Sequence, residues 1–465
     1  MNRITRRKFL RLAGIAGSAS LLAGCAPAVT PTTEPTKAAP VVPAATSVSS
    51  TGCKFKKCKL IVASWWGPHE IEGAEKSFAG TFKQQTGIDV KYEFITNAEY
   101  NTKVLTNLSG SDPYDVVTYS ADFVPAYIEK GILIPLDDLI KRDKLDLSNI
   151  QPAALEQWMY DGKLYGLTAD MGSYHFYFNK EHFAKAGITP PKPTDEWTWD
   201  QLREWAKALT IKKGDQIVQY GFAGTGGQGA WDAYPNTNGA FMFSEGMKKA
   251  LMDDPKVIEA LTFYQDLLYK DGVALKPGST PTSEQDMFLA GQISIMFGGT
   301  WRLGYYRSKK TEMKFDWDVG LPPHNATAKE WFIPNFTAGW TIPKNAKDID
   351  ASWEAMKFYA GDTFAKEAMF TSLSGLPTTK TVLAGAWYAQ WPENPPQGLT
   401  KEFYSAILQH GRAQRHLRYS LGPDITAAMK QLDLIYNGQE KPANLLPKMA
   451  ADINKLLSER PWNKT

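Results

Sequence analysis

The feature of this 465-residue chain that most restricts its fold is an alternation of strand and helix patterns that begins near residue 59. Residues 59–65 form a short apolar run with β-branched side chains, residues 70–85 have helical spacing, and residues 86–94 form a second strand pattern. A helix pattern near residues 99–109 and a strand pattern at residues 115–119 follow. Strands that alternate with helices form parallel α/β sheets, which bind ligands at the carboxyl ends of their strands. The sequence therefore predicts α/β lobes.

The length and charge of the chain narrow its organisation and its partners. Because single hydrophobic cores stop growing at roughly 250–300 residues, we expect two or three domains. The chain has 52 basic and 49 acidic side chains, and residues 1–24 hold five of the basic ones and no acid, so the remainder has 52 − 5 = 47 basic against 49 acidic side chains. No basic run with interleaved aromatic residues occurs, which disfavours nucleic-acid binding. The 15 tryptophans exceed the needs of a core, so we expect some of them to contact a ligand.

The first 24 residues have the order of features of an export signal. Arg6 and Arg7 precede an apolar stretch of small residues that is too short to span a bilayer. The paired arginines resemble the twin-arginine signal, and LAGC at residues 22–25 resembles the lipobox at which bacterial lipoproteins are cleaved and acylated on the cysteine. We therefore predict a signal peptide over residues 1–24, lipidation of Cys25, and anchoring of the exported protein to the outer face of the cytoplasmic membrane.

A linker and a close cysteine pair follow the signal. Residues 26–50 consist mainly of Pro, Thr, Ala, Val and Ser, and cannot bury enough apolar surface to fold. We assign residues 25–54 to a lipid-anchored linker. Outside the cytoplasm Cys53 and Cys58 can form a disulfide, with two free thiols as the alternative. A metal site would need further soft ligands, which the neighbouring sequence lacks.

An ordered set of motifs resembles a known family. The motifs are FKQQTGIDV at residues 82–90, PYDVV at 113–117, EKGILIPLD at 129–137, DGKLYGL at 161–167, YFNKE at 177–181, TWDQL at 198–202, FLAGQISIM at 288–296, GTW at 299–301 and GWTIP at 339–343. Together they are similar to the family 1 extracellular solute-binding proteins of ABC importers, the group that includes the maltose-binding proteins. The similarity extends from residue 59 to about residue 460.

This resemblance implies an α/β, type II periplasmic-binding-protein fold, in which two lobes joined by several crossing segments close around a central cleft. By similarity, the crossing segments lie near residues 166–174, 333–340 and 373–378. Lobe one comprises residues 55–169 plus 337–376, and lobe two comprises residues 170–334 plus 377–465. The implied protein is a monomer without enzymatic activity or cofactor. It captures a carbohydrate, preferably an oligosaccharide, and delivers it to the membrane permease subunits of an ABC importer.

Motifs for catalysis are weak or absent. Residues 224–229 fit G-x-G-x-x-G, but Pro235 and several turn formers follow in place of a long helix, so a loop that carries Trp231 into the cleft is favoured over a cofactor site. The six histidines include no i, i+4 pair for zinc, and no G-x-S-x-G elbow occurs. A glycosidase needs only two carboxylates. An extracytoplasmic glycoside hydrolase is therefore one alternative, and a binder of the same fold for a polyol, glycerol-phosphate or iron is the other.

The candidate ligand-binding residues are aromatic or acidic and lie after strands or in crossing segments. Indole rings can stack on sugar rings, and carboxylates accept bonds from hydroxyl groups. Trp301 is the favoured stacking residue, because Gly298 and Gly299 open the backbone before it. At most one of Trp65 and Trp66 can face the cleft, because neighbours on a strand point in opposite directions. The full set is Trp65, Trp66, Glu70, Tyr119, Asp122, Asp170, Tyr174, Trp231, Asp232, Trp301 and Trp340.

Each candidate also has a structural alternative. The tryptophans can belong to the core, Glu70 can favour a helix N-terminus, and Asp122 can cap a helix. Asp170 and Tyr174 can belong to the hinge without contacting a ligand.

Overall fold

The computed structural model describes residues 52–96, 98–121, 123–224, 231–369, 375–385, 398–419, 421–460 and 463. Residues Ser50–Thr465 form a compact unit that is separate from Met1–Ser49. The predicted signal peptide with Cys25, most of the predicted linker, Asp122 and residues 225–230 lie outside the described residues.

The compact unit contains two clusters of buried hydrophobic residues, each built around one sheet. The first core contains residues between Leu60 and Ala169 and between Trp340 and Ala368. The second core contains residues between Met171 and Ile333, together with Ala365 and residues between Leu376 and Leu457. We call the elements around these cores lobe one and lobe two. The described chain changes from one core to the other near residues 169–171 and 333–340, and again between Ala368 of the first core and Leu376 of the second.

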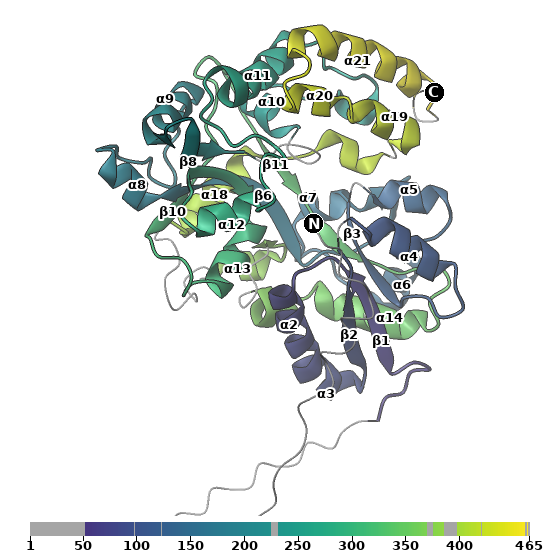
Figure 1. The fold of residues 1–465 in the computed structure, drawn as a ribbon. Helices are drawn as coiled ribbons and strands as arrows, with labels where there is room; N and C mark the ends of the chain where they lie inside the picture. Colours follow the sequence, from purple (N-terminus) through teal and green to yellow (C-terminus); the bar gives the residue numbers. More distant parts are fainter. Residues whose placement is uncertain are drawn as a thin grey trace, which may run out of the picture. The chain divides into compact units, whose positions relative to one another are not determined.

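Lobe one has a four-stranded sheet in the order β12-β3-β1-β2. The first three strands in the sequence, β1, β2 and β3, run parallel to one another, whereas β12 joins β3 in the antiparallel direction. Figure 1 shows α2 on one side of these strands and α4 and α5 on the other. The predicted strand–helix–strand units are therefore present. The strands are β1 (Lys59–Ser64), β2 (Asp89–Phe94), β3 (Val116–Ser120) and β12 (Ala338–Thr341).

Lobe two is built on β6 (Asp170–Asn179), in which all ten residues are buried. The sheet order is β14-β11-β6-β9-β8-β7, and β10 and β13 pair with β6 as well. The strand begins where the chain leaves the first core, so it connects the first crossing directly to the centre of lobe two. The other strands of this sheet are β7 (Ile211–Lys213), β8 (Gln216–Ala223), β9 (Ile293–Gly299), β10 (Trp317–Gly320), β11 (Ile333–Phe336), β13 (Leu376–Pro377) and β14 (Gly411–Ala413).

The helices begin and end at signals that the sequence carries. Thr198 caps α9 with its side chain and forms a capping box with Gln201, as the TWDQL motif predicts. The predicted helix at residues 70–85 is present as α2, a π-helical turn at Phe78–Phe82 and α3. The helices of lobe one are α2 (Pro68–Ser77), α3 (Lys83–Thr86), α4 (Tyr100–Leu108), α5 (Val124–Glu129), α6 (Asp137–Asp143), α7 (Pro152–Glu156), α14 (Ile349–Tyr359) and α15 (Asp362–Phe364).

In lobe two, helices cover both faces of the sheet (Figure 1). The helices α19, α20 and α21, near the C-terminus of the chain, form a group of their own. The helices of this lobe are α8 (Lys180–Lys185), α9 (Trp199–Leu209), α10 (Ala233–Thr237), α11 (Pro255–Gln265), α12 (Glu284–Leu289), α13 (Trp301–Ser308), α17 (Lys380–Ala384), α18 (Lys401–His410), α19 (Gly422–Met429), α20 (Leu432–Tyr436) and α21 (Pro442–Ser458). A small hairpin of β4 (Met159–Tyr160) and β5 (Lys163–Leu164) precedes the first crossing.

The N-terminal end of the described chain is fixed to lobe one. Cys53 and Cys58 form a disulfide. Between them, the Lys57 ammonium lies 2.8 Å from the buried carboxylate of Asp115, and the Lys57 backbone N–H donates to Asp348 at 3.0 Å. Burial raises the pKa of Asp115 in spite of this cation. The segment is thus held against the sheet and the start of α14.

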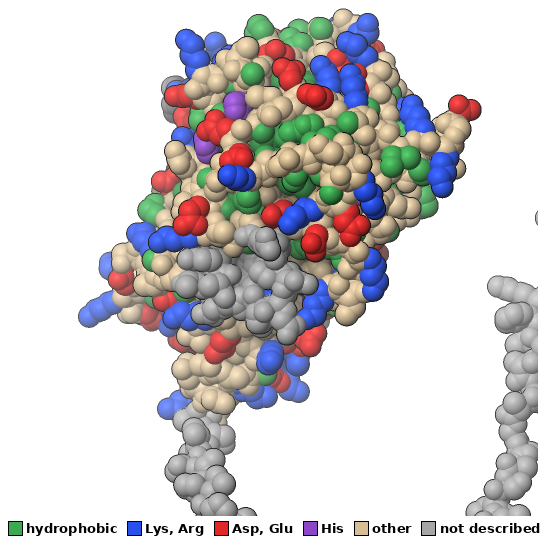
Figure 2. Space-filling model, turned by 90° about the vertical axis from the view of Figure 1, so that its left-hand side faces the viewer, with side chains coloured by type: hydrophobic (Ala, Val, Ile, Leu, Met, Phe, Trp, Pro, Cys, Tyr) green, Lys and Arg blue, Asp and Glu red, His purple; other side chains and the backbone are tan. Residues whose placement is uncertain are grey.

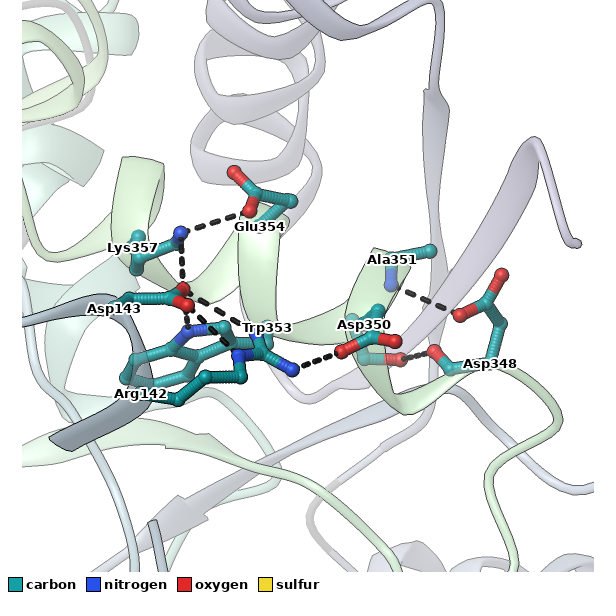
Figure 3. A network of polar contacts seen from close by, with 9 residues as sticks. Arg142, Asp143, Asp348, Asp350, Ala351, Trp353, Glu354 and Lys357 are labelled. Atoms are coloured by element: carbon teal, nitrogen blue, oxygen red, sulfur yellow. Dashed lines mark hydrogen bonds and ion pairs between the residues drawn. The ribbon is translucent and has the colours of Figure 1, made fainter. Parts of the chain in front are cut away.

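A polar network joins α6 to α14 on the same lobe (Figure 3). The Asp143 carboxylate accepts bonds from Arg142 and from the Lys357 ammonium and Trp353 indole, each at 2.8 Å. Arg142 also donates to Asp350 at 2.5 Å. Arg142 and Lys357 hold the pKa of Asp143 well below its usual range.

Hydrogen bonds from buried threonines link the three crossings. The Thr168 hydroxyl lies 2.7 Å from the Ala338 carbonyl oxygen in the second crossing and 2.6 Å from that of Asp170. The Thr378 hydroxyl in the third crossing donates to the Thr168 carbonyl oxygen at 2.8 Å. Residues Leu167 and Trp340 exchange two backbone bonds. The first crossing therefore holds the other two in place.

We expect Thr168→Val to destabilise the protein. The substitution keeps the shape of the side chain but removes a fully buried hydroxyl and leaves the Ala338 carbonyl oxygen without this donor. The free energy of unfolding should fall by about 1–3 kcal/mol, measured by urea denaturation. Thr282→Val, at an exposed position, is the control. A loss no larger than in the control would mean that the Thr168 hydroxyl does not hold the crossings together.

Candidate functional site

An aromatic cluster lies where β6, β11 and α13 meet. The ring centroid of Tyr174 is 5.7 Å from that of Trp301 and 5.3 Å from that of Phe336, and the Trp301 and Phe336 centroids are 5.5 Å apart. Tyr174 is buried, whereas Trp301 and Phe336 are half-buried. Two of the predicted site residues, Tyr174 and Trp301, are thus brought together from positions more than a hundred residues apart.

Two glycines make room for these rings. A Cβ atom at Gly299 would lie 1.8 Å from the Trp301 ring, and one at Gly172 would lie 2.3 Å from the Phe336 ring. Only a residue without a side chain permits such close approach of a ring to the backbone. Gly299 is one of the two glycines that favoured Trp301 as a stacking residue in the sequence.

A buried carboxylate stands on the same face of β6 as this cluster. Asp170, Gly172 and Tyr174 alternate along the strand and therefore share a face. Asp170 is 6% exposed, and its Oδ1 has no hydrogen-bond partner among the described residues. Burial, together with the nearby carboxylate of Glu70, raises the pKa of Asp170 to about 7. An acceptor of this kind is available to a ligand hydroxyl.

Glu70 comes from lobe one and has a structural role as well. Its Oε2 accepts the Gly67 backbone N–H at 2.6 Å and so belongs to a capping box at the start of α2. Its charge raises the pKa of Asp170, which places the two carboxylates near each other across the lobes. Helices α2 and α13 also contact each other. The predicted residues Glu70, Asp170 and Trp301 thus lie at the contact between the two lobes.

A second carboxylate lies on the lobe-two side. Asp232 is 4% exposed, its Oδ2 is 3.6 Å from His416 Nδ1, and its Oδ1 has no hydrogen-bond partner within the described part of the chain. The Trp231 ring packs on His416 at 5.1 Å. Burial raises the pKa of Tyr436, and the charge of Asp232 is one of the neighbouring groups that add to this shift.

Trp340, a predicted ligand contact, lies in the aromatic core of lobe one. Its ring is fully buried between Phe78 and Tyr359, with centroids 5.3 and 4.3 Å away and interplanar angles of 10° and 2°. Since aromatic side chains cover both faces of the indole, no sugar ring can stack there. Strand β12 turns the Trp340 side chain into the core of lobe one, where stacking on a sugar is not possible in this arrangement.

The pair Trp65 and Trp66 divides as expected. Trp66 is buried and packs on Tyr92 and Tyr359 at 6.0 and 6.2 Å. Trp65 is half-buried and contacts Tyr100 edge-on at 4.8 Å. Trp65 is therefore the more accessible of the two.

Tyr119 belongs to a buried tyrosine cluster next to Trp65. Its ring lies 4.4 Å from that of Tyr127 and 6.3 Å from that of Tyr100. Burial raises the pKa of Tyr119. The structure brings Tyr119 and Trp65 together through Tyr100, which contacts both rings.

Sequence reasoning missed Phe336 and His416. Phe336 lies within the predicted crossing at residues 333–340, in which only Trp340 is a candidate from the sequence. His416 occurs in a basic stretch without a metal-binding spacing, so only the fold reveals its contact with Asp232. Gly172 is the one signal for Phe336, because a glycine inside a strand often marks a close approach.

Metal-binding clusters and membrane-spanning helices are both absent from the described residues. These residues contain no group of three or more His, Cys, Asp or Glu side chains that could hold a metal ion. None of their helices is both long and apolar enough to cross a membrane. Figure 2 shows acidic and basic side chains interspersed over the described part of one face, without the basic stripe that nucleic acid requires.

Comparison with known proteins gives a consistent result. The family model described as bacterial extracellular solute-binding protein matches residues 67–366. The maltotriose-binding protein of Pyrococcus abyssi is 22% identical over 334 residues, which cover 70% of this chain and 67% of that protein. The arabinooligosaccharide-binding protein of Bacillus subtilis is 24% identical over 250 residues, which cover 52% of this chain and 55% of that protein.

Solved structures share the fold. An ABC substrate-binding protein of Listeria monocytogenes, in complex with cycloalternan, has a TM-score of 0.75 at 24% identity, covering 87% of this chain and 99% of that chain. The GacH receptor of Streptomyces glaucescens, solved unliganded and with acarbose, has a TM-score of 0.73 at 20% identity, covering 87% of this chain and 99% of that chain. The two α/β lobes therefore form the fold of the periplasmic sugar-binding proteins.

The raised pKa of Asp170 predicts a pH-dependent stability. The folded protein holds this proton more tightly than the unfolded chain, in which Asp titrates near pH 4, so the contribution of Asp170 to stability falls as pH rises from about 4 to about 7. Asp170→Asn removes the ionised form. The variant should therefore gain stability relative to the wild type between about pH 5 and about pH 8 in urea denaturation.

The exposed Asp253 provides the control, because Asp253→Asn should show a difference from the wild type that does not depend on pH. If the stability difference between Asp170→Asn and the wild type stayed constant across this pH range, Asp170 would not have the raised pKa of a buried carboxylate.

Proposed function

We propose, since the chain belongs to the bacterial extracellular solute-binding protein family, that it captures a carbohydrate between its lobes for an ABC importer. The observation that carries this proposal is the aromatic cluster of Trp301, Tyr174 and Phe336, which shares β6 with Asp170, a buried carboxylate that has an unpartnered oxygen among the described residues. Flat apolar faces suit sugar rings, and carboxylates suit hydroxyl donors. A phosphate or carboxylate ligand would instead need cationic side chains.

An oligosaccharide fits the length of this arrangement. Asp170 and Tyr174 are four residues apart on one strand, which corresponds to roughly 13 Å. A ligand that reaches the Asp170 carboxylate and also stacks on the rings around Tyr174 is longer than one sugar ring. The ligands named for the similar proteins, maltotriose, arabinooligosaccharides, cycloalternan and acarbose, support the same class.

We further propose that the lobes move as two bodies with the boundaries of the sequence analysis, residues 55–169 plus 337–376 and residues 170–334 plus 377–465. The threonine-linked crossings are the hinge. The contact between α2 and α13 is then the closing side of the cleft. In this proposal Trp65, Trp66, Tyr119 and Trp231 line or support the cleft walls. The closed, monomeric protein delivers the sugar unchanged to the membrane permease subunits.

Calorimetric titration with maltotriose and with arabinooligosaccharides tests the function. We expect at least one of them to bind, and the sugar to be recovered intact after prolonged incubation. Shortened products would instead support a glycoside hydrolase. Failure of every neutral oligosaccharide, with binding of glycerol-phosphate or a polyol, would overturn the proposed ligand class.

Trp301→Ala should weaken this binding and leave the fold intact. Loss of a stacking indole costs about 1–3 kcal/mol, or roughly ten- to a hundredfold in affinity. Tyr305→Ala, on the same helix and directed to Asp286, is the matched control and should keep wild-type affinity. If Trp301 belonged only to the core, Trp301→Ala would lower stability by about 3–5 kcal/mol and leave the affinity of the folded fraction unchanged.

We also propose that the mature protein begins at an acylated Cys25 and is held to the outer face of the cytoplasmic membrane by the linker of residues 25–54. Expressed in its bacterial setting, Cys25→Ser should move the protein from the membrane to the soluble fraction, as followed by immunoblotting. Cys53→Ser keeps Cys25 and should stay in the membrane fraction. Retention of the Cys25→Ser protein in the membrane fraction would argue against the lipid anchor.

A further inference from the structure

A pocket lies apart from the aromatic site, between α17 and α18. Its volume is ≈ 220 Å³, and its lining includes Lys380 and Leu383 from α17, Lys401, Ser405 and Leu408 from α18, and Gln151. Along α18 the lining residues are spaced i, i+4 and i+7, and along α17 they are spaced i and i+3. Such spacings place side chains on one face of a helix, so the two helices present facing surfaces to the pocket.

The pocket has an apolar body and a positively charged rim. Leu383 and Leu408 are half-buried and supply the apolar part. Lys380 and Lys401 are exposed, and neither forms an ion pair with a carboxylate of the described residues. The Lys380 ammonium donates to the Ser148 carbonyl oxygen at 2.6 Å, which holds it in place. Asp146 and Glu402 attract Lys380 and Lys401 electrostatically without forming an ion pair with them. Two exposed cations over an apolar surface suit an anion that carries a hydrocarbon chain.

The pocket also sits where the third crossing is attached to lobe one. The Gln151 backbone N–H donates to the Thr378 carbonyl oxygen at 2.8 Å, and the Lys380 backbone N–H donates to the Asn149 carbonyl oxygen at 2.7 Å. Gln151 precedes α7 of lobe one, and α18 packs on the second core. A ligand in this pocket therefore contacts both lobes beside the hinge.

We propose that this pocket is a second binding site, separate from the sugar cleft, for a small organic anion with an apolar chain, such as a short-chain carboxylate. The carboxylate lies between the Lys380 and Lys401 ammonium groups, and the chain lies against Leu383 and Leu408. Ser405 and Gln151 supply the neutral polar edge. The site requires no sugar, so its existence does not depend on the function proposed for the cleft.

The test uses hexanoate as the probe and the full mature protein without sugar. A ligand that binds only the folded state raises the thermal unfolding midpoint. Hexanoate should raise the midpoint and should bind in a calorimetric titration, whereas hexanamide, with the same chain and no charge, should do neither. Inorganic phosphate stabilises proteins by exclusion from their surface, and this effect should be equal in every variant.

Variants at the pocket separate a site from a general salt effect. Lys401→Gln and Lys380→Gln should each weaken hexanoate binding by about two- to fivefold, as expected for one exposed ion pair. Ser405→Trp should fill the pocket and abolish binding, and because Ser405 is exposed its midpoint without ligand should match the wild type. Lys448→Gln, an exposed lysine on α21, is the matched control and should bind like the wild type.

Three outcomes would overturn the proposal. Equal hexanoate effects in the wild type, Ser405→Trp and Lys401→Gln would show that the pocket does not bind it. If hexanamide bound as well as hexanoate, the pocket would not recognise the negative charge. If phosphate bound and the lysine variants weakened its binding as much as that of hexanoate, the pocket would not recognise the apolar chain. Trp301→Ala should keep full hexanoate binding, which distinguishes this site from the cleft.

Discussion

Strand β6 is the constraint on which both the fold and the site depend. It begins at the first crossing, is buried along all ten residues, and pairs with β9, β10, β11 and β13. The same strand carries Asp170 and Tyr174 on one face, with Gly172 between them as the place where the Phe336 ring meets the backbone. A shift of the pairing by one residue would turn all three residues to the opposite face. The register of lobe two therefore sets the geometry of the site.

Local sequence signals were sufficient for the elements and for part of the site. The parallel strands of lobe one and the capped start of α9 follow from β-branched runs and from the Thr198 to Gln201 capping pattern. The position of the Trp301 ring against the backbone could be anticipated, because the glycines before it leave room for a ring. The ordered motifs predicted the two-lobed fold, which the solved structures share.

The rest of the site depends on contacts between distant segments. Trp340 is aromatic and lies in a crossing segment, as expected of a ligand contact. Phe78 and Tyr359 nevertheless cover its ring, and neither is close to it in the sequence. Phe336 and His416 join the site only because β6 lies beside β11 and because Asp232 lies beside the segment after β14. A single sequence shows that an aromatic residue is available, but packing decides whether its faces are covered.

The two buried carboxylates explain why such a fold should respond to a ligand. A buried acceptor without a donor destabilises the state that buries it, and at Asp170 the neighbouring charge of Glu70 adds to this cost. Glu70 and Asp170 approach each other where the lobes meet, so in the proposed two-body motion this cost falls on the closed arrangement and not on each lobe separately. In the proposed site, hydroxyl donors from a bound sugar remove that cost and stacking on Trp301 adds to the binding. A ligand shifts a conformational equilibrium by its differential affinity for the two states. Under this proposal, the unpartnered acceptor of Asp170 therefore disfavours closure without a ligand and favours it with one.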